Sequence, residues 1–312
     1  MAARHVPVLY KEILDYACCR SGEIFVDATL GSGGHSLGLL ERYGGIGRLI
    51  GIDCDQEGLE RARVTLEPFV NKVTLLHGNF RHLTRLLEQE GIAAIGGIMF
   101  DFGVSTPQLK DPARGFGFSN DGALDMRMDT SMPQTALDLV KRLSAQELED
   151  IIRVYGEERF ARRIASAVKE AVARNDNLST GGLADTVFRA IPARFHPDRL
   201  HPATRTFQAL RIAVNDELEA IKEGLDQALE LLTPGGRLLA ISFHSLEDRI
   251  VKNRFRDWEK KCRCPAGLPV CVCGGTQRIR VLTRKPVYAA DEEVTLNPSS
   301  RSARLRVAER LH

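Results

Sequence analysis

Short apolar runs alternate with amphipathic stretches along residues 23–101. The apolar runs are five or six residues long and rich in Ile, Val and Leu, which is typical of strands buried in a sheet. Repeated strand–helix units predict a parallel sheet with helices on both faces, that is, an α/β fold. The expected strands are 23–27, 48–53, 73–77 and 97–101, and the expected helices are 35–43, 56–66 and 81–90.

The alternation stops after Asp101. Residues 103–135 are rich in Gly, Pro and Asp, and the following stretch is helical in pattern, with a capping box at Ser144-Ala-Gln-Glu147. We expect helices at 136–143, 144–155 and 157–173, then a helix at 217–232, a turn at 233–236 and a strand at 237–242. The predicted organisation is a discontinuous sheet domain, 1–107 with 206–312, split by a helical insertion at 108–205.

The composition is that of a globular protein, with 43% apolar and 27% charged residues. The longest apolar run, Ile92 to Phe100, is nine residues, whereas a bilayer span needs about 20. The N-terminus lacks the apolar core of a signal peptide. We therefore expect a cytoplasmic protein without membrane association. The sequence does not determine whether it forms a homodimer.

The net charge of +2 conceals an uneven distribution. Residues 249–312 hold 15 Lys and Arg against 6 Asp and Glu, residues 153–211 hold 11 against 6, and the remainder is acidic. Basic segments of this length suggest a polyanionic partner, because neutralised phosphates release their counterions. Arginines paired with neighbours on solvated helix faces would give the same composition.

Four of the seven cysteines form two C-x-C pairs around a Pro- and Gly-containing loop. They are Cys262, Cys264, Cys271 and Cys273. Four thiolates on a tight loop could hold a zinc ion, although C-x-C is a less frequent zinc spacing than C-x-x-C. Reduced structural thiols are the alternative, and the sequence leaves both open.

A glycine-rich turn, Gly31-Ser-Gly-Gly34, follows Asp27 where the first strand passes into the first helix. Backbone N–H groups of such a turn can approach a ligand closely. A dinucleotide fingerprint would need a further glycine at Ser36, which disfavours a nicotinamide oxidoreductase. Asp53 ends the second strand, where a carboxylate commonly takes the two hydroxyls of a ribose. Together these positions indicate an adenosyl cofactor.

Further candidate side chains lie at or after the ends of other predicted strands, at the same edge of the sheet. Phe80 follows the third strand and could pack on an adenine, Asp101 ends the fourth, and His244 follows the fifth. We find no Ser-His-Asp spacing, no H-E-x-x-H and no phosphate-binding G-x-x-x-x-G-K. Hydrolase and NTPase interpretations therefore lack their essential residues.

Seven distinctive blocks occur along about residues 5–310. They are Gly33-Gly-His-Ser36, Asp101-Phe-Gly-Val-Ser-Thr-Pro-Gln108, Arg114-Gly-Phe-Gly-Phe118, Leu124-Asp-Met-Arg-Met-Asp129, Tyr155-Gly-Glu-Glu-Arg-Phe160, His201-Pro-Ala-Thr-Arg-Thr-Phe207 and Ser242-Phe-His-Ser-Leu-Glu-Asp-Arg249. In this order they resemble the signature blocks of the RsmH (MraW) family. These are bacterial enzymes that methylate cytosine N4 in 16S rRNA of the small ribosomal subunit, at nucleotide 1402 of the decoding region, and use S-adenosylmethionine.

The resemblance implies a class I methyltransferase, with a Rossmann-like, mostly parallel seven-stranded sheet interrupted by a helical substrate-recognition domain. It implies cofactor contacts at Gly33, Gly34, His35, Asp53, Phe80, Asp101 and Gln108. Many amino-methylating enzymes carry Asp/Asn-Pro-Pro-aromatic where this chain has Asp101-Phe-Gly-Val. Roles assigned by analogy with those enzymes do not carry over at this block.

Methyl transfer from a sulfonium needs no metal and no covalent enzyme intermediate, so positioning would supply most of the rate. Asp101 is the expected acceptor for the N4 proton, with a backbone carbonyl beside it as the second choice. Expected substrate contacts are Phe102, Phe116 or Phe118 for stacking a base, Arg205 and Arg211 for rRNA, and His244. An RNA-binding assembly factor that keeps the cofactor pocket only for structure is the alternative function.

Overall fold

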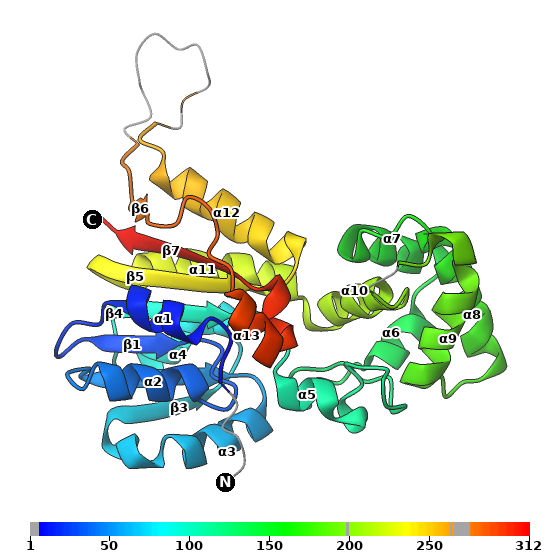
Figure 1. Cartoon of the computed structure of the whole chain (residues 1–312), viewed down its shortest axis with the longest axis horizontal. Coiled ribbons are helices and arrows are strands. Elements are labelled where there is room, and N and C mark those ends of the chain that lie inside the picture. Colours follow the sequence, from blue (N-terminus) through cyan, green and yellow to red (C-terminus); the bar gives the residue numbers. More distant parts are fainter. Residues whose placement is uncertain (1–5, 198–199, 263, 265–274) are drawn as a thin grey trace. The chain divides into compact units, whose positions relative to one another are not determined.

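The computed structural model describes residues 6–197, 200–262, 264 and 275–312. The chain divides into two compact units, which we describe separately (Figure 1). The sheet unit comprises Met1–Gly103 and Leu218–His312, and the helical unit comprises Val104–Glu217.

The sheet unit contains one seven-stranded sheet in the order β3-β2-β1-β4-β5-β7-β6. The pairs among β1 to β5 are parallel, and β7 is antiparallel to both β5 and β6. The mostly parallel, seven-stranded sheet of the expected fold class is thus confirmed. The strands are β1 Ile24–Asp27, β2 Arg48–Asp53, β3 Val73–His77, β4 Ile95–Asp101, β5 Leu232–Ser242, β6 Ile279–Val281 and β7 Arg304–Arg310.

Helices cover both faces of this sheet because its strands are apolar on both sides. In β4, Ile98 and Phe100 face a core shared with α4, α11 and α12. Met99, between them, faces a second core shared with α1, α2 and α3. A strand with two buried faces reads as a continuous apolar run, as the sequence showed. The helices are α1 Tyr10–Ala17, α2 Gly34–Arg42, α3 Gln56–Thr65, α4 Leu83–Gln89, α11 Glu217–Leu231, α12 Ser245–Glu259 and α13 Asp291–Leu296.

The predicted turn at residues 233–236 is wrong. Those residues lie inside β5, which begins at Leu232 directly after α11. The pairing with β4 shifts register between Ile95 and Gly97, and Gly235 has a φ of 81°. The Thr-Pro-Gly-Gly segment therefore forms an irregularity within the strand, which a turn-like composition cannot distinguish from a turn.

The helical unit has its own apolar core, formed by one face of each of its longer helices. The capping box predicted at Ser144 and Glu147 is present at the start of α7. The helix expected at 157–173 begins instead at Ala161, because Glu157 ends α7 in the left-handed conformation with a φ of 48°. The helices are α5 Thr106–Lys110, α6 Ala136–Arg142, α7 Ala145–Gly156, α8 Ala161–Arg174, α9 Thr180–Ala190 and α10 Thr204–Asn215.

The bounds of the helical unit differ from the predicted insertion, residues 108–205. A boundary after residue 205 would cut α10 near its first residue. That helix packs on α7 and shares the core of the helical unit through Phe207 and Leu210. The whole of α10 therefore belongs to the insertion, which extends to Glu217.

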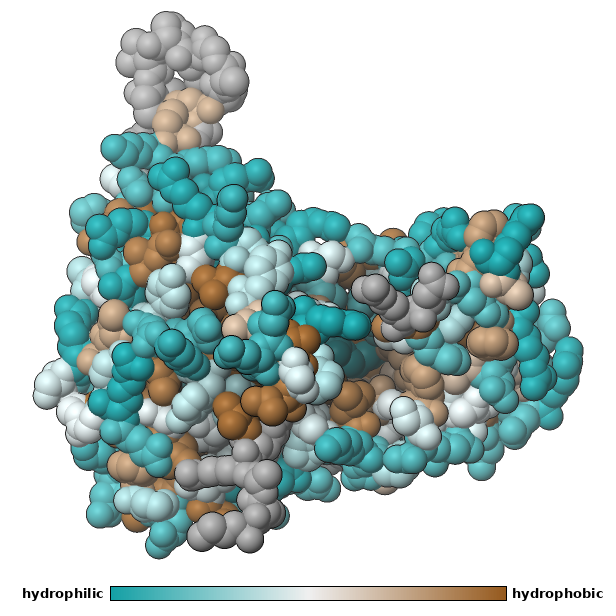
Figure 2. Space-filling model, in the orientation of Figure 1, coloured by the Kyte–Doolittle hydropathy of each residue, from teal (hydrophilic) through white to brown (hydrophobic). Residues whose placement is uncertain are grey.

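Hydrophilic residues cover most of the surface visible in Figure 2. Within the described ranges, no helix is long and apolar enough to cross a membrane. The zinc interpretation falls partly on Cys271 and Cys273, which lie outside the described residues. Of the other two cysteines, Cys262 is exposed and Cys264 is partly exposed.

The ion pair between β7 and α12 provides a test of this fold. Arg306 donates to Asp248 through Nε at 2.6 Å and Nη2 at 3.1 Å, and the two side chains are only 7% and 15% exposed. Arg306→Ala would leave Asp248 buried without its partner, which costs about 3 kcal/mol of unfolding free energy. Arg280→Ala is the control, because Arg280 pairs with Glu309 from a 60% exposed position and its loss should cost under about 1 kcal/mol. Urea unfolding measures both losses, and equal losses would contradict the structural role of Arg306.

Candidate active site

The parallel strands of the sheet end along one edge, which we call the carboxyl edge, and four of them end in an acidic or hydroxyl side chain. Asp27, Asp53, Asp101 and Ser242 are the last residues of β1, β2, β4 and β5. The strand order reverses direction between β1 and β4. In open α/β sheets, ligands bind at such a switch point, outside the carboxyl ends of the strands. Asp27 and Asp101 flank this position.

The glycine-rich turn joins β1 to α2 at the switch point. Gly33 has a φ of 80° and is the N-cap of α2, a conformation that favours glycine. A Cβ on Gly34 would lie 2.6 Å from Cγ of Pro7, so this position has no room for a side chain. The start of α2 therefore presents backbone N–H groups without a capping side chain, as the first turn of a helix does in anion-binding sites.

Asp27 is only 1% exposed. Its Oδ2 accepts a hydrogen bond from Oγ of Ser36 at 2.7 Å, and its Oδ1 accepts from the N–H of Thr29 at 3.3 Å. Burial raises the pKa of Asp27 to about 6, against the lowering effect of these bonds. The residue that departs from a dinucleotide fingerprint, Ser36, therefore orients the carboxylate at the end of β1.

Asp53 is oriented by two backbone donors. Its Oδ2 accepts from the N–H of Gly31 at 2.6 Å, and its Oδ1 accepts from the N–H of Asp55 at 2.8 Å. Burial raises its pKa, against these two bonds. A carboxylate has about four acceptor positions, so both oxygens keep capacity for the hydroxyls of a ribose.

Asp101 lies across the switch point, at the end of β4. Its N–H donates to Oγ1 of Thr29 at 2.6 Å, which links the ends of β4 and β1. Its Oδ1 is buried and has no hydrogen-bond partner among the described residues. Burial, followed by the charges of Asp27 and Glu247, raises the pKa of Asp101 to about 8. A cation beside this carboxyl group would therefore be favourable, and the carboxyl group has none among the described residues.

His35 does not supply that cation. Its Nδ1 lies 3.9 Å from Oδ2 of Asp101, and its Nε2 lies 2.9 Å from the carbonyl oxygen of Val8. Since a carbonyl only accepts, Nε2 carries the hydrogen and Nδ1 is unprotonated. Burial lowers the pKa of His35 to about 4. The imidazole is therefore neutral at pH 7 and supplies no positive charge to stabilise the ionised form of Asp101.

Phe80 lies beyond the end of β3 with part of its surface exposed. Its ring contacts Phe100 edge-on at 5.5 Å between centroids and Phe102 at 5.9 Å. Gly224 of α11 allows this position, because a Cβ there would lie 2.7 Å from Cδ2 of Phe80. The exposed part of Phe80 is thus available as an apolar surface at the carboxyl edge.

His244 and Glu247 begin α12 after the end of β5. Glu247 is completely buried, and its Oε2 accepts from the N–H groups of Phe243 and His244 at 2.7 and 3.2 Å. Nε2 of His244 lies 3.0 Å from Oε1 of Glu247, and its Nδ1 accepts from the N–H of Glu247 at 3.4 Å. His244 is therefore a helix cap as well as a group near the edge. Glu247 was not among the site residues expected from the sequence, although its spacing from His244 is that of a capping box.

The structure corrects three of the expected substrate contacts. Phe102 and Phe116 are 2% and 7% exposed and belong to the cores of their units, so neither offers a face to a base. Arg211 donates to both oxygens of Glu217 at 2.7 and 2.8 Å, with its side chain 16% exposed. Composition alone did not distinguish these buried positions from surface ones.

The other predicted residues of the helical unit have structural partners as well. Gln108 is 6% exposed and its Oε1 accepts from the N–H of Ser105 at 2.8 Å, closing the capping box of α5. Arg205 donates to the carbonyl of Glu157 at 3.3 Å and lies 3.8 Å from Glu158, with about half of its side chain exposed. The ring of Phe118, the third expected stacking residue, packs against His201 and Phe207.

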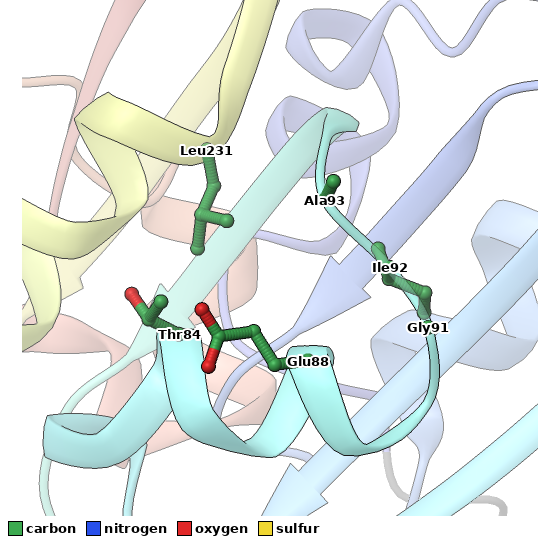
Figure 3. A pocket seen from close by; sticks show the side chains of 6 residues that line it. All are labelled: Thr84, Glu88, Gly91, Ile92, Ala93 and Leu231. Carbon is green, nitrogen blue, oxygen red and sulfur yellow. The ribbon is translucent and has the colours of Figure 1, made fainter.

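A cavity of about 440 Å³ lies away from this edge. Figure 3 shows Leu231 reaching toward Thr84 and Glu88 of α4. The lining residues Ile92 and Ala93 precede β4, whereas Asp101 ends it, so the cavity and the carboxylates lie at opposite ends of the strand. Glu88 is the one charged side chain among its lining residues, and a single carboxylate does not make a catalytic or cofactor site. Nowhere in the described ranges do three or more His, Cys, Asp or Glu side chains gather as metal ligands.

Comparison with known proteins matches residues 2–311 to the MraW methylase family. A ribosomal RNA small subunit methyltransferase H of Pelobacter propionicus is 51% identical and covers 99% of both chains. Proteins of the same name from Geobacter sulfurreducens and a Paenibacillus species are 50% and 46% identical, covering 100% and 99% of both chains. Among solved structures, an rRNA methylase from Streptococcus thermophilus aligns with all of this chain and 99% of its own, at 11% identity and a TM-score of 0.42.

The raised pKa of Asp101 predicts a pH dependence of stability. Between its unfolded pKa near 3.8 and its folded pKa of about 8, the folded state binds more protons, so stability falls as pH rises through this range. Asp101→Asn removes this term. Without ligand, the unfolding free energy of the variant should rise relative to that of the wild type by roughly 4 to 5 kcal/mol between pH 4.5 and pH 8.5, at about 1.4 kcal/mol per unit of pH up to the folded pKa. Urea unfolding at the two pH values measures the difference, and a difference that stays constant with pH would contradict the assignment.

Proposed function

The chain belongs to the MraW methylase family, and from this premise we propose that it methylates N4 of a cytidine in the decoding region of 16S rRNA. The methyl donor is S-adenosylmethionine. The substrate is the small ribosomal subunit, which also implies a cytoplasmic location. The helical unit is the substrate-recognition domain in this proposal.

The uncompensated carboxyl group of Asp101 is the observation that supports this proposal best. Burial raises the pKa of Asp101, and the charges of Asp27 and Glu247, the other acidic groups near the switch point, raise it further. Burial without a counter-charge is costly for a carboxylate. A ligand with positive charge would relieve this cost, and S-adenosylmethionine carries two such charges, an ammonium and a sulfonium.

The remaining groups at the carboxyl edge suit the other parts of the same cofactor. The backbone of Gly33, Gly34 and His35 would hold the carboxylate of the methionine part, because these N–H groups begin a helix. Asp53 would accept from the ribose hydroxyls, and Phe80 would pack on adenine. We keep Gln108 as a proposed contact to the methionine end.

S-adenosylmethionine supplies an electrophilic methyl group when bound. The chain must then position a weak nucleophile, since the N4 lone pair of cytosine is delocalised into the ring. In-line positioning supplies several kcal/mol of the barrier reduction. Asp101, ionised once a cation lies beside it, would accept a hydrogen bond from the N4 amino group and then its proton. Glu247 would act as a positioning residue by holding the β5–α12 turn, and His244 would face the substrate from this turn.

A transfer assay tests the proposal. We expect the protein to move label from S-adenosylmethionine to small subunits isolated from a strain that lacks this enzyme, and mass spectrometry of the rRNA to find one N4-methylated cytidine. Asp101→Asn should bind subunits normally but lower kcat by at least about 100-fold, since general-base catalysis contributes 10²–10⁴. Subunit binding without any transfer by the wild type would favour a non-catalytic assembly factor. Near-normal turnover of the variant would remove Asp101 from its role.

A further inference from the structure

The helical unit carries a group of arginines that lack polar partners. Residues 104–217 contain as many Asp and Glu as Lys and Arg, and most of the described basic side chains are engaged. Arg174 pairs with Glu170 at 3.1 Å, and Lys169 donates to three backbone carbonyls. Four arginines form neither a hydrogen bond nor an ion pair with any described residue, and we call them the α8 patch: Arg159, Arg162, Arg163 and Arg194.

Aromatic rings join two members of the patch. The guanidinium of Arg159 lies 4.2 Å from the ring centroid of Phe195 and 4.8 Å from that of Phe160, and Arg194 lies 4.8 Å from Phe195. The two rings contact each other at 5.2 Å. A guanidinium stacked on a ring keeps its N–H groups directed outward and loses little freedom when it binds an anion.

Arg162 and Arg163 complete the patch in the first turn of α8. Both are exposed and lie three and four residues beyond Arg159 along the chain, with only Phe160 between Arg159 and the start of the helix. The first turn of α8 contains no acidic residue. Glu158 is the nearest acid along the chain, but it is buried and lies 3.8 Å from Arg205.

This arrangement is unfavourable without an anion. Like charges on neighbouring exposed side chains repel one another, although solvent weakens the effect. A row of phosphates would relieve the repulsion and release counterions from the nucleic acid. None of the described acidic residues of the unit forms an ion pair with these arginines, so the charge of this surface is not compensated within the described ranges.

We propose that the α8 patch binds backbone phosphates of rRNA. This inference rests on the proposed function, which makes RNA the polyanion that the helical unit meets. It differs from the expectation that Arg205 and Arg211 are the rRNA contacts, because those two side chains have acidic neighbours within the unit. Planar guanidinium groups match phosphate oxygens in pairs, which favours recognition of an ordered backbone.

The test compares two double variants of the full chain. Arg162→Gln with Arg163→Gln removes half of the patch without touching the stacked rings. Arg174→Gln with Arg189→Gln is the matched control, since both side chains are 78% or more exposed but each faces an acid one turn away. The probes are a fluorescent RNA hairpin with the decoding-region sequence, small subunits, and vesicles of anionic lipid.

We expect the patch variant to bind the hairpin with a slope of log affinity against log salt that is smaller by about 1.4 to 1.8, for two lost phosphate contacts. Its KM for small subunits should rise about tenfold or more, while its kcat and its affinity for S-adenosylmethionine stay at the wild-type values. The control variant should match the wild type in all of these measurements.

Equal salt slopes for patch variant and wild type would overturn the proposal. A patch variant that loses binding to the vesicles but not to the hairpin would also overturn it, in favour of a lipid surface. If the wild type transfers no methyl group to subunits, the proposed function fails. The salt slopes for the hairpin still decide whether the patch binds RNA phosphates.

Discussion

Burial of acidic side chains without a counter-charge is the constraint on which the candidate site depends. Asp27 and Asp101 end the two strands that flank the switch point, and Glu247 accepts hydrogen bonds from the backbone of the β5–α12 turn. The nearest histidine, His35, is neutral because its own burial lowers its pKa. A folded chain retains such a cluster only if packing elsewhere stabilises it, and here two apolar cores, one on each face of the sheet, do so. The cluster thus favours a bound cation, and a cofactor that brings a positive charge would stabilise the site as it binds.

Short polar links determine where these carboxylates point. Thr29 joins the end of β1 to the end of β4, Ser36 orients Asp27, and Gly31 orients Asp53. Thr29 and Gly31 lie in the turn between β1 and α2, and Ser36 lies in the first turn of α2, so one short segment, residues 29–36, contacts all three acids. The helical unit distributes its charged side chains differently. Among the described residues, it pairs most of its charges internally and leaves the α8 patch without polar partners. The proposed work is thus divided into cofactor chemistry on the sheet and phosphate binding on the insertion.

The sequence predicted the four strands between residues 23 and 101 and their parallel pairing, because each is a short apolar run that ends in a polar group. It failed at residues 233–236, where turn-like residues sit inside β5, and at Glu157, where a left-handed residue separates two helices. The acids of the carboxyl edge were predictable from their positions after strands. The roles of Thr29 and Glu247 were not, since they depend on which strands become neighbours. Nor could composition reveal that Phe102 and Arg211 are buried while Arg162 is exposed.

Proton release on cofactor binding tests the central claim most directly. At pH 7 the carboxyl group of Asp101, with its pKa of about 8, is mostly protonated in the free protein. If a cation of S-adenosylmethionine docks beside it, that proton must leave. Calorimetric titrations at pH 7 in buffers of different ionisation enthalpy should give close to one proton released per cofactor by the wild type and close to none by Asp101→Asn. Release that is absent in the wild type, or equal in the two proteins, would contradict the account.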